Sequence, residues 1–261
     1  MNYEIIDFHT HPFLTNEYNI CNHIPNCNMS PKNTLTMMNR LGVSKICGSV
    51  VKAGCLREKE TWWDRVRECN DQALKLKDLY GDFYIAGFHI HPDFPEESIA
   101  EIDAMHAKGV KLIGELVPYM MGYSKYNTPE LNKIIDYATT KGMIVSIHTM
   151  SDDDMDSFVE AHPDTKIIAA HPGELSCLLR HLERLKRHPN YYIDLSGTGM
   201  FRHGMVKRII DEVGVDRILY GSDFPTCNPS MFLGGVLFDE LISPQEKQTI
   251  FSGNAKRLLK L

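Results

Sequence analysis

The 261-residue sequence has no apolar run that approaches the roughly 18 residues of a membrane span. It has no excess of positive charge, since its formal net charge is -6 and its pI is about 6.0, and this argues against nucleic acid as a partner. Seven cysteines are an odd number in a long chain and indicate reduced thiols rather than a disulfide scaffold. The first residues do not resemble a secretory signal. We therefore expect a soluble, cytoplasmic protein with no membrane or nucleic acid partner.

No Pro/Gly/Ser-rich linker divides the chain, and apolar β-branched runs alternate with amphipathic stretches throughout. The apolar runs predict eight strands, near residues 3–9, 43–51, 83–89, 110–117, 143–148, 166–171, 191–195 and 217–221. Helical patterns lie near residues 31–41, 61–80, 97–108, 129–141, 153–161, 174–188, 202–213 and 244–251. Strands that alternate with helices indicate a parallel sheet covered by helices. Eight such units in about 250 residues favour an α/β protein with one (β/α)8 TIM barrel domain over residues 1–261.

Residue types that bind metals stand at the C-terminal ends of five predicted strands. His9 and His11 are one residue apart, so in a strand their side chains share one face. A single histidine at a strand end is usually only a polar residue that meets solvent. Because the strands of a parallel barrel end at one face, we expect six such side chains to converge on one mouth. They are His9, His11, Glu115, His148, His171 and Asp223.

This set of imidazoles and carboxylates predicts one or two divalent metal ions, with zinc preferred and manganese, iron or nickel as alternatives. A bound ion lowers the pKa of its water towards ~7. Asp223 is then the candidate to take the proton of that water and pass it to a leaving group. His171 is a candidate to polarise a substrate carbonyl or to bind a second ion. Glu115 is a candidate to bridge two ions, and the alternative is a positioning carboxylate without a metal bond.

Three residues are candidates for substrate binding. Tyr119 belongs to residues 118–128, which follow the fourth strand and form either a substrate wall or an ordinary loop. His91 ends the third strand in a second His-x-His-Pro pattern, and we assign it to the mouth and to substrate contact rather than to a metal. Arg202 is a candidate to bind a substrate carboxylate through two hydrogen bonds, and the alternative is an exposed charge at a helix start.

Several motifs along the chain follow one known pattern. They are Asp7-Phe8-His9-Thr10-His11, His148, His171-Pro172-Gly173, Gly221-Ser222-Asp223-Phe224-Pro225 and the closing Gly253-Asn254-Ala255-Lys256-Arg257-Leu258. Together they resemble the amidohydrolase superfamily, and within it the amidohydrolase family 2 branch of metal-dependent TIM-barrel hydrolases. The resemblance extends over nearly the whole chain.

The resemblance implies a role for each residue at the strand ends. The implied roles are metal ligand for His9, His11 and His148, ligand and proton shuttle for Asp223, and catalytic or second-metal histidine for His171. Many relatives carry a carboxylated lysine on the fourth strand. Lys111 lies on that strand but too early, so we expect Glu115 to replace the lysine, as glutamate does in some relatives with two ions.

We predict a metal-dependent hydrolase that activates water to cleave an amide, ester or lactone bond of a small organic substrate. The alternative is a metal-dependent nonoxidative decarboxylase of a small unsaturated or aromatic acid, because the same branch resembles such enzymes. A bridging Glu115 with two ions favours hydrolysis, and one ion with His171 free favours decarboxylation. Phosphoester hydrolysis and a non-catalytic barrel with a structural metal also stay open. A homodimer stays open because three loop residues look exposed and apolar, namely Phe13, Met120 and Phe232.

Overall fold

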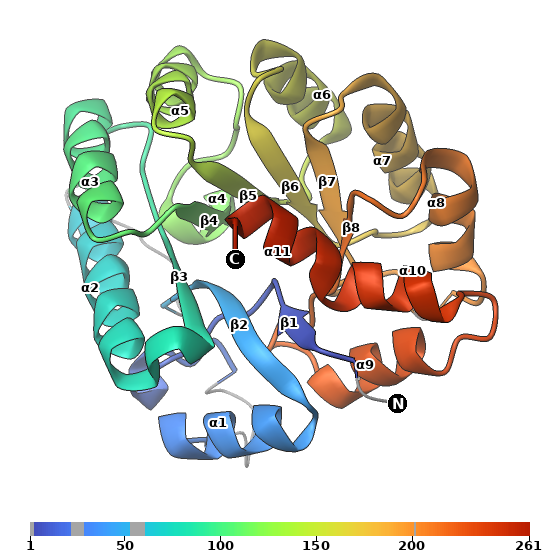
Figure 1. Ribbon diagram of the computed structural model, residues 1–261. Helices are drawn as coiled ribbons and strands as arrows, with labels where there is room; N and C mark the ends of the chain where they lie inside the picture. Colours follow the sequence, from blue (N-terminus) through green and yellow to red (C-terminus); the bar gives the residue numbers. More distant parts are fainter. Residues whose placement is uncertain (1–2, 22–28, 53–60, 201) are drawn as a thin grey trace.

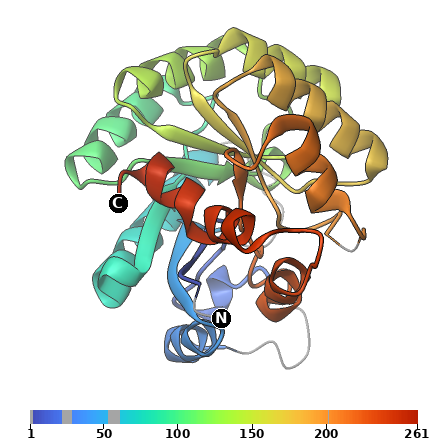
Figure 2. The same ribbon diagram turned by 45° about the vertical axis from the view of Figure 1, so that its right-hand side comes forward.

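Eight parallel strands lie side by side in chain order, with helices around them, in this computed structural model (Figures 1 and 2). The structure describes residues 3–21, 29–52, 61–200 and 202–261. The strands are β1 (Ile5–Asp7), β2 (Val43–Ser49), β3 (Tyr84–Phe88), β4 (Leu112–Leu116), β5 (Ile144–His148), β6 (Lys166–Ala170), β7 (Tyr191–Asp194) and β8 (Ile218–Leu219). The predicted (β/α)8 fold is confirmed.

The helices follow the predicted pattern, with some additions. They are α1 (Pro31–Arg40), α2 (Trp62–Tyr80), α3 (Pro95–Ala107), α4 (Pro118–Met121), α5 (Pro129–Thr140), α6 (Asp152–Ala161), α7 (Leu175–Arg187), α8 (Met205–Val213), α9 (Pro229–Leu237), α10 (Pro244–Gln248) and α11 (Asn254–Leu259). A π-helical turn, η4 (Thr249–Gly253), joins α10 to α11. None of the helices in the described ranges combines the length and the apolar character needed to cross a membrane.

Three helices lie outside the predicted helical ranges. The C-terminal helix α11 follows the pattern predicted near residues 244–251, and α4 and α9 occupy stretches after the fourth and eighth strands. Both α4 and α9 begin at a proline, whose fixed φ suits the first helical position. The side chain of Asn228 also accepts a hydrogen bond from Ser230 N and so caps α9. Residues 118–128, for which an ordinary loop was one expectation, are therefore partly helical.

The residues that follow the first and last strands close the barrel through backbone hydrogen bonds. Phe8 N donates to Tyr220 O at 2.8 Å. Beyond the strands, Asp223 N donates to His9 O at 2.8 Å, and His11 N donates to Phe224 O at 2.6 Å. The segments that follow β1 and β8 are therefore held against each other at the C-terminal face of the barrel.

The C-terminal helix α11 covers the opposite end of the barrel (Figure 1). The amide of Asn254 donates to Ile218 O at 2.6 Å and to Val215 O at 2.7 Å, which ties α11 to β8. Apolar side chains of the strands and of α11 form one buried cluster, made of Ile6, Phe8, Cys47, Leu112, Ile144, Ile168, Leu219, Ala255 and Leu258. The mouth at the C-terminal ends of the strands lies away from this covered end.

The expected exposure of Phe13 and Phe232 is wrong. Each is only 2% exposed, and Phe13 stacks on Phe224 with a centroid distance of 6.4 Å. Met120 is half-buried. The apolar residues that suggested a homodimer are therefore mainly part of the core of one chain.

A buried polar contact connects α7 to β7. His181 is fully buried, and its Nδ1 lies 2.8 Å from the hydroxyl of Tyr191. Its Nε2 lies 3.3 Å from Thr149 Oγ1. Burial lowers the pKa of His181 to about 3, so the ring is neutral in the folded protein at neutral pH.

We expect acid to destabilise the fold through His181. An unfolded histidine has a pKa of ~6.5, so below that pH the unfolded chain binds a proton that the buried ring does not bind. The contribution of His181 is fully present above pH ~6.5 and is lost as the pH falls, at up to ~1.4 kcal/mol per pH unit. The variant His181→Gln should flatten the pH dependence of the free energy of unfolding in urea, measured between pH ~6.5 and ~4.5.

The matched control is His106→Gln, because His106 is an exposed histidine on α3. This variant should keep the slope of the wild type. Equal slopes in the wild type and in His181→Gln would show that His181 takes up a proton in the folded state.

Candidate metal centre

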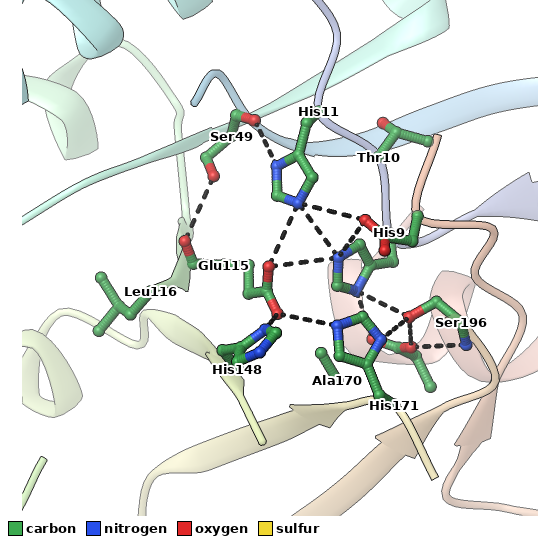
Figure 3. Close-up of polar contacts among 12 residues, drawn as sticks. His9, Thr10, His11, Ser49, Glu115, Leu116, His148, Ala170, His171 and Ser196 are labelled. Atoms are coloured by element: carbon green, nitrogen blue, oxygen red, sulfur yellow. Dashed lines mark hydrogen bonds and ion pairs between the residues drawn. The ribbon is translucent and has the colours of Figure 1, made fainter. Parts of the chain in front are cut away.

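The side chains of His9, His11 and Glu115 face one another in the mouth of the barrel (Figure 3). The Nε2 atoms of His9 and His11 are 3.3 Å apart. Glu115 Oε2 lies 3.4 Å and 3.2 Å from these two nitrogens, and Asp223 Oδ1 lies 3.7 Å and 3.6 Å from them. Ligands at 2.0–2.2 Å from one tetrahedral ion are separated from one another by about 3.3–3.6 Å. His9, His11 and Asp223 form one of the two possible donor groups among the described residues, so the spacing fits an ion held by these three side chains, with Glu115 Oε2 close to both histidine nitrogens.

The hydrogen bonds behind His9 and His11 direct their lone pairs to this point. His9 Nδ1 lies 2.8 Å from Asp194 Oδ2, and His11 Nδ1 lies 3.0 Å from the carbonyl oxygen of Ser49. A carboxylate and a carbonyl oxygen only accept hydrogen bonds, so each Nδ1 must carry the hydrogen. In the neutral rings Nε2 is then free to bind a metal, which is the usual arrangement of metal-binding histidines.

The charges of this cluster favour a cation. Burial opposes a charge on His9, but the carboxylates of Asp194 and Glu115 outweigh burial and hold the pKa of His9 well above its usual value. Burial likewise opposes the charge of Glu115, but His9, His11 and His148 outweigh it and hold the pKa of Glu115 well below its usual value. A divalent ion would take the place of the proton on His9, so the residues present fit a bound metal.

The second oxygen of Glu115 faces the other two histidines. Its Oε1 lies 2.9 Å from His148 Nδ1 and 3.6 Å from His171 Nε2. His171 also forms a possible donor group with His9 and Glu115, whereas His148 belongs to neither donor group found among the described residues. Burial lowers the pKa of His171, so its ring is neutral at neutral pH. All six predicted residues thus lie together, in two groups around Glu115.

Two residues of the centre have strained backbones. His171 has a φ of 70° and Asp223 has a φ of 58°, in the left-handed region that residues with a Cβ rarely adopt. Beside them Gly197 has a φ of 59°, and a Cβ at that position would overlap Nδ1 of His171. Such strain is concentrated at functional sites, where the surrounding structure holds it in place.

The centre forms one wall of a cavity of about 310 Å³. The other described residues that line it are Ile20, Cys21, Val51, Val117, Tyr119, Met120 and Thr226. Tyr119, on α4, is largely exposed, and its ring meets that of His148 edge to face at a centroid distance of 5.5 Å. The cavity therefore has one polar wall, formed by the candidate metal centre, and mainly apolar side chains on its other walls.

The other two candidates for substrate contact lie elsewhere. His91 is fully buried, its Nε2 bonds the carbonyl oxygen of Met121 at 2.8 Å, and its Nδ1 accepts from Asp93 N at 3.1 Å. Arg202 forms an ion pair with Glu174. Within the described part of the chain neither residue lines the cavity. The structure places His91 under α4 and Arg202 in an ion pair with Glu174, and substrate binding by either residue stays a prediction.

The sequence analysis missed two residues that support the centre. Asp194 ends β7, and Ser196 follows two residues later; both are fully buried beside His9 and His171. The signal was the one already used for the other strands, a carboxylate at a C-terminal strand end. It was not applied to the seventh strand.

We expect Asp194→Asn to weaken metal binding by about 10–100-fold, because the amide cannot replace the charge that orients His9. Competition with a chromophoric chelator at neutral pH measures the dissociation constant. The control is Asp103→Asn, which changes an exposed carboxylate on α3. Unchanged affinity in Asp194→Asn would contradict a metal ligand role for His9.

A model of the amidohydrolase family (Amidohydro_2) matches residues 6–261. A comparison with curated proteins found no match. Among solved structures the chain is similar to 2,6-dihydroxybenzoate decarboxylase from Rhizobium, with 16% identity, a TM-score of 0.74 and coverage of 99% of each chain. It is also similar to dihydroxybenzoic acid decarboxylase from Polaromonas sp. JS666, with 14% identity, a TM-score of 0.74 and coverage of 100% of this chain and 98% of that chain.

A third similar structure is an uncharacterized TIM-barrel protein from Bordetella bronchiseptica, with 17% identity, a TM-score of 0.77 and coverage of 98% of each chain. At such identities the likeness to solved structures shows the fold alone. The match to the family model covers almost the whole chain, including the motifs at both ends. The chain therefore belongs to the amidohydrolase family.

Proposed function

We propose that this chain is a metal-dependent nonoxidative decarboxylase of a small aromatic or unsaturated acid. The observation that carries the proposal is the donor group of His9, His11 and Asp223, with Glu115 Oε2 3.4 Å and 3.2 Å from the Nε2 atoms of the two histidines. Glu115 Oε2 thus lies beside that group, while its Oε1 lies within hydrogen-bond distance of His148 Nδ1. One ion with His171 outside its ligand set is the arrangement that favours decarboxylation over hydrolysis. This proposal gives the alternative of the sequence analysis more weight than its preferred hydrolase.

The similar solved structures also support a decarboxylase rather than a hydrolase. One of them is a 2,6-dihydroxybenzoate decarboxylase complexed with 2,6-dihydroxybenzoate. The Polaromonas structure has bound manganese and the inhibitor 2-nitroresorcinol. Manganese should therefore be tested beside zinc, since imidazole and carboxylate ligands suit both ions.

The proposed ligands are His9, His11, Glu115 and Asp223. A ligand role for His148 stays a prediction, because its contact in the structure is with Glu115. When bound, the ion supplies a positive charge that fixes a substrate carboxylate and stabilises negative charge next to it. The apolar side chains of Val51, Val117 and Met120 then face the rest of the substrate, and a cavity of about 310 Å³ suits a single ring.

The reaction breaks one carbon–carbon bond and makes one carbon–hydrogen bond. The carboxylate leaves as carbon dioxide, its bonding electron pair stays on the substrate carbon, and that carbon takes one proton. Asp223 and His171 line the cavity and are the groups that can hold this proton. We assign to His171 the uptake of one proton from solvent at Nε2 and its transfer to Asp223, and to Asp223 the delivery of that proton to the substrate carbon. Burial of the centre keeps bulk water from competing for the proton.

Hydrolysis is the second candidate, and one observation favours it. Glu115 directs its two oxygens to two separate pairs of histidines, as a carboxylate that bridges two ions would. The predicted substrates of this reaction are small amides, esters and lactones.

Release of carbon dioxide tests the proposal. Protein loaded with Mn²⁺ or Zn²⁺ should convert 2,6-dihydroxybenzoate or another single-ring hydroxybenzoate to the decarboxylated product and carbon dioxide in equal amounts. Chromatography measures the acid and its product over time. Asp223→Asn should lower kcat by about 10²-fold or more. Its metal content is measured in the same samples, so that loss of the ion is distinguished from loss of the proton donor. Cleavage of esters or lactones with no decarboxylation of any acid would contradict the proposal and favour hydrolysis.

A further inference from the structure

Behind the metal centre, one buried carboxylate contacts both a histidine and a serine. Asp194 Oδ2 lies 2.8 Å from His9 Nδ1. Its other oxygen, Oδ1, accepts from the backbone N of Ser196 at 2.9 Å and from the hydroxyl of Ser196. Asp194 and Ser196 are both fully buried. Ser196 Oγ also lies 3.1 Å from Nδ1 of His9, but that nitrogen carries the hydrogen it donates to Asp194 and cannot accept. The single hydrogen of the Ser196 hydroxyl is therefore committed to Asp194, because a carboxylate only accepts.

The oxygen of this hydroxyl lies next to a second histidine. Ser196 Oγ is 3.0 Å from His171 Nδ1 (Figure 3). Since the hydroxyl gives its hydrogen to Asp194, its oxygen can only accept from His171, and Nδ1 of His171 must carry the hydrogen. In a neutral ring Nε2 then has a lone pair, and this atom points to Glu115 Oε1 at 3.6 Å and to the cavity.

The backbone around His171 supports this orientation of the ring. His171 adopts a left-handed φ of 70°, and Gly197 leaves room for the ring because a Cβ there would overlap Nδ1. The hydroxyl of Thr149 donates to the carbonyl oxygens of Ala170 and His171 and so holds the backbone before the ring. The ring is thus placed from three sides.

We propose that Ser196 is a positioning residue that selects the tautomer of His171 with the hydrogen on Nδ1 and the lone pair of Nε2 directed into the cavity. The inference deepens the proposed function, in which His171 relays a proton. His171 then faces the substrate as a proton acceptor, and it becomes a proton donor only after Nε2 has received a proton. One carboxylate, Asp194, orients a metal ligand through Oδ2 and the relay histidine through Ser196.

Nitrogen NMR reads the tautomer directly and requires no activity. Protein labelled with 15N-histidine and loaded with diamagnetic Zn²⁺ gives two-bond 1H–15N spectra, in which the protonated ring nitrogen is distinguished from the bare one. The signals of His171 are identified by their loss in His171→Gln. The wild type should show the hydrogen on Nδ1. In Ser196→Ala the signals of His171 should change to a mixture of tautomers or to the form with the hydrogen on Nε2.

The same variant separates this role from metal binding. Ser196→Ala removes the 3.1 Å contact of Ser196 Oγ with His9 Nδ1 but keeps the shorter contact of His9 with Asp194 at 2.8 Å, so its zinc content should equal that of the wild type. Ser196→Thr retains the hydroxyl and should restore the tautomer of the wild type. If the decarboxylation assay succeeds, kcat should fall by about tenfold in Ser196→Ala with little change in KM.

A hydrogen on Nε2 of His171 in the wild type would overturn the inference, and so would an unchanged tautomer in well-folded Ser196→Ala. These spectra do not depend on the substrate. Failure of the decarboxylation assay with the expected tautomers would refute the proposed function and leave the role of Ser196 intact.

Discussion

The joint between the ends of the first and last strands is the contact on which the rest of this molecule depends. Asp223 N donates to His9 O at 2.8 Å, so the two segments that carry His9, His11 and Asp223 cannot separate without breaking a backbone hydrogen bond. Asp7 strengthens the joint, because its Oδ1 accepts from Ser222 N at 2.9 Å. Closing the barrel and assembling the candidate metal centre are therefore one structural event.

The centre concentrates charge where burial makes charge costly. Glu115 and Asp194 are almost completely buried, and a buried carboxylate is tolerated only when it is paired and hydrogen-bonded. The imidazoles of His9, His11 and His148 provide this pairing in the metal-free protein. Asp7 is less well compensated, since burial raises its pKa to about 7. A site of this kind gains from a bound cation, because the ion compensates the buried carboxylates.

The general architecture and the location of the centre could be predicted from the sequence, since strand periodicity and barrel topology determine both. Topology alone places His148, His171 and Asp223 at one face of the barrel. Which of them contact the candidate ion and which do not could not be predicted, because this depends on which oxygen of Glu115 each side chain faces. The two His-x-His-Pro patterns show the same limit. One contributes both histidines to the centre, while in the other His91 packs against Trp62 under α4.

The number of metal ions per chain tests the central claim most directly. The protein would be purified without chelators, saturated with Zn²⁺ or Mn²⁺, freed of loosely bound ions by gel filtration and measured by elemental analysis. Our account predicts one ion per chain, held among His9, His11, Glu115 and Asp223. Two ions per chain would contradict it, because Glu115 would then act as a bridge and the site would be that of a binuclear hydrolase.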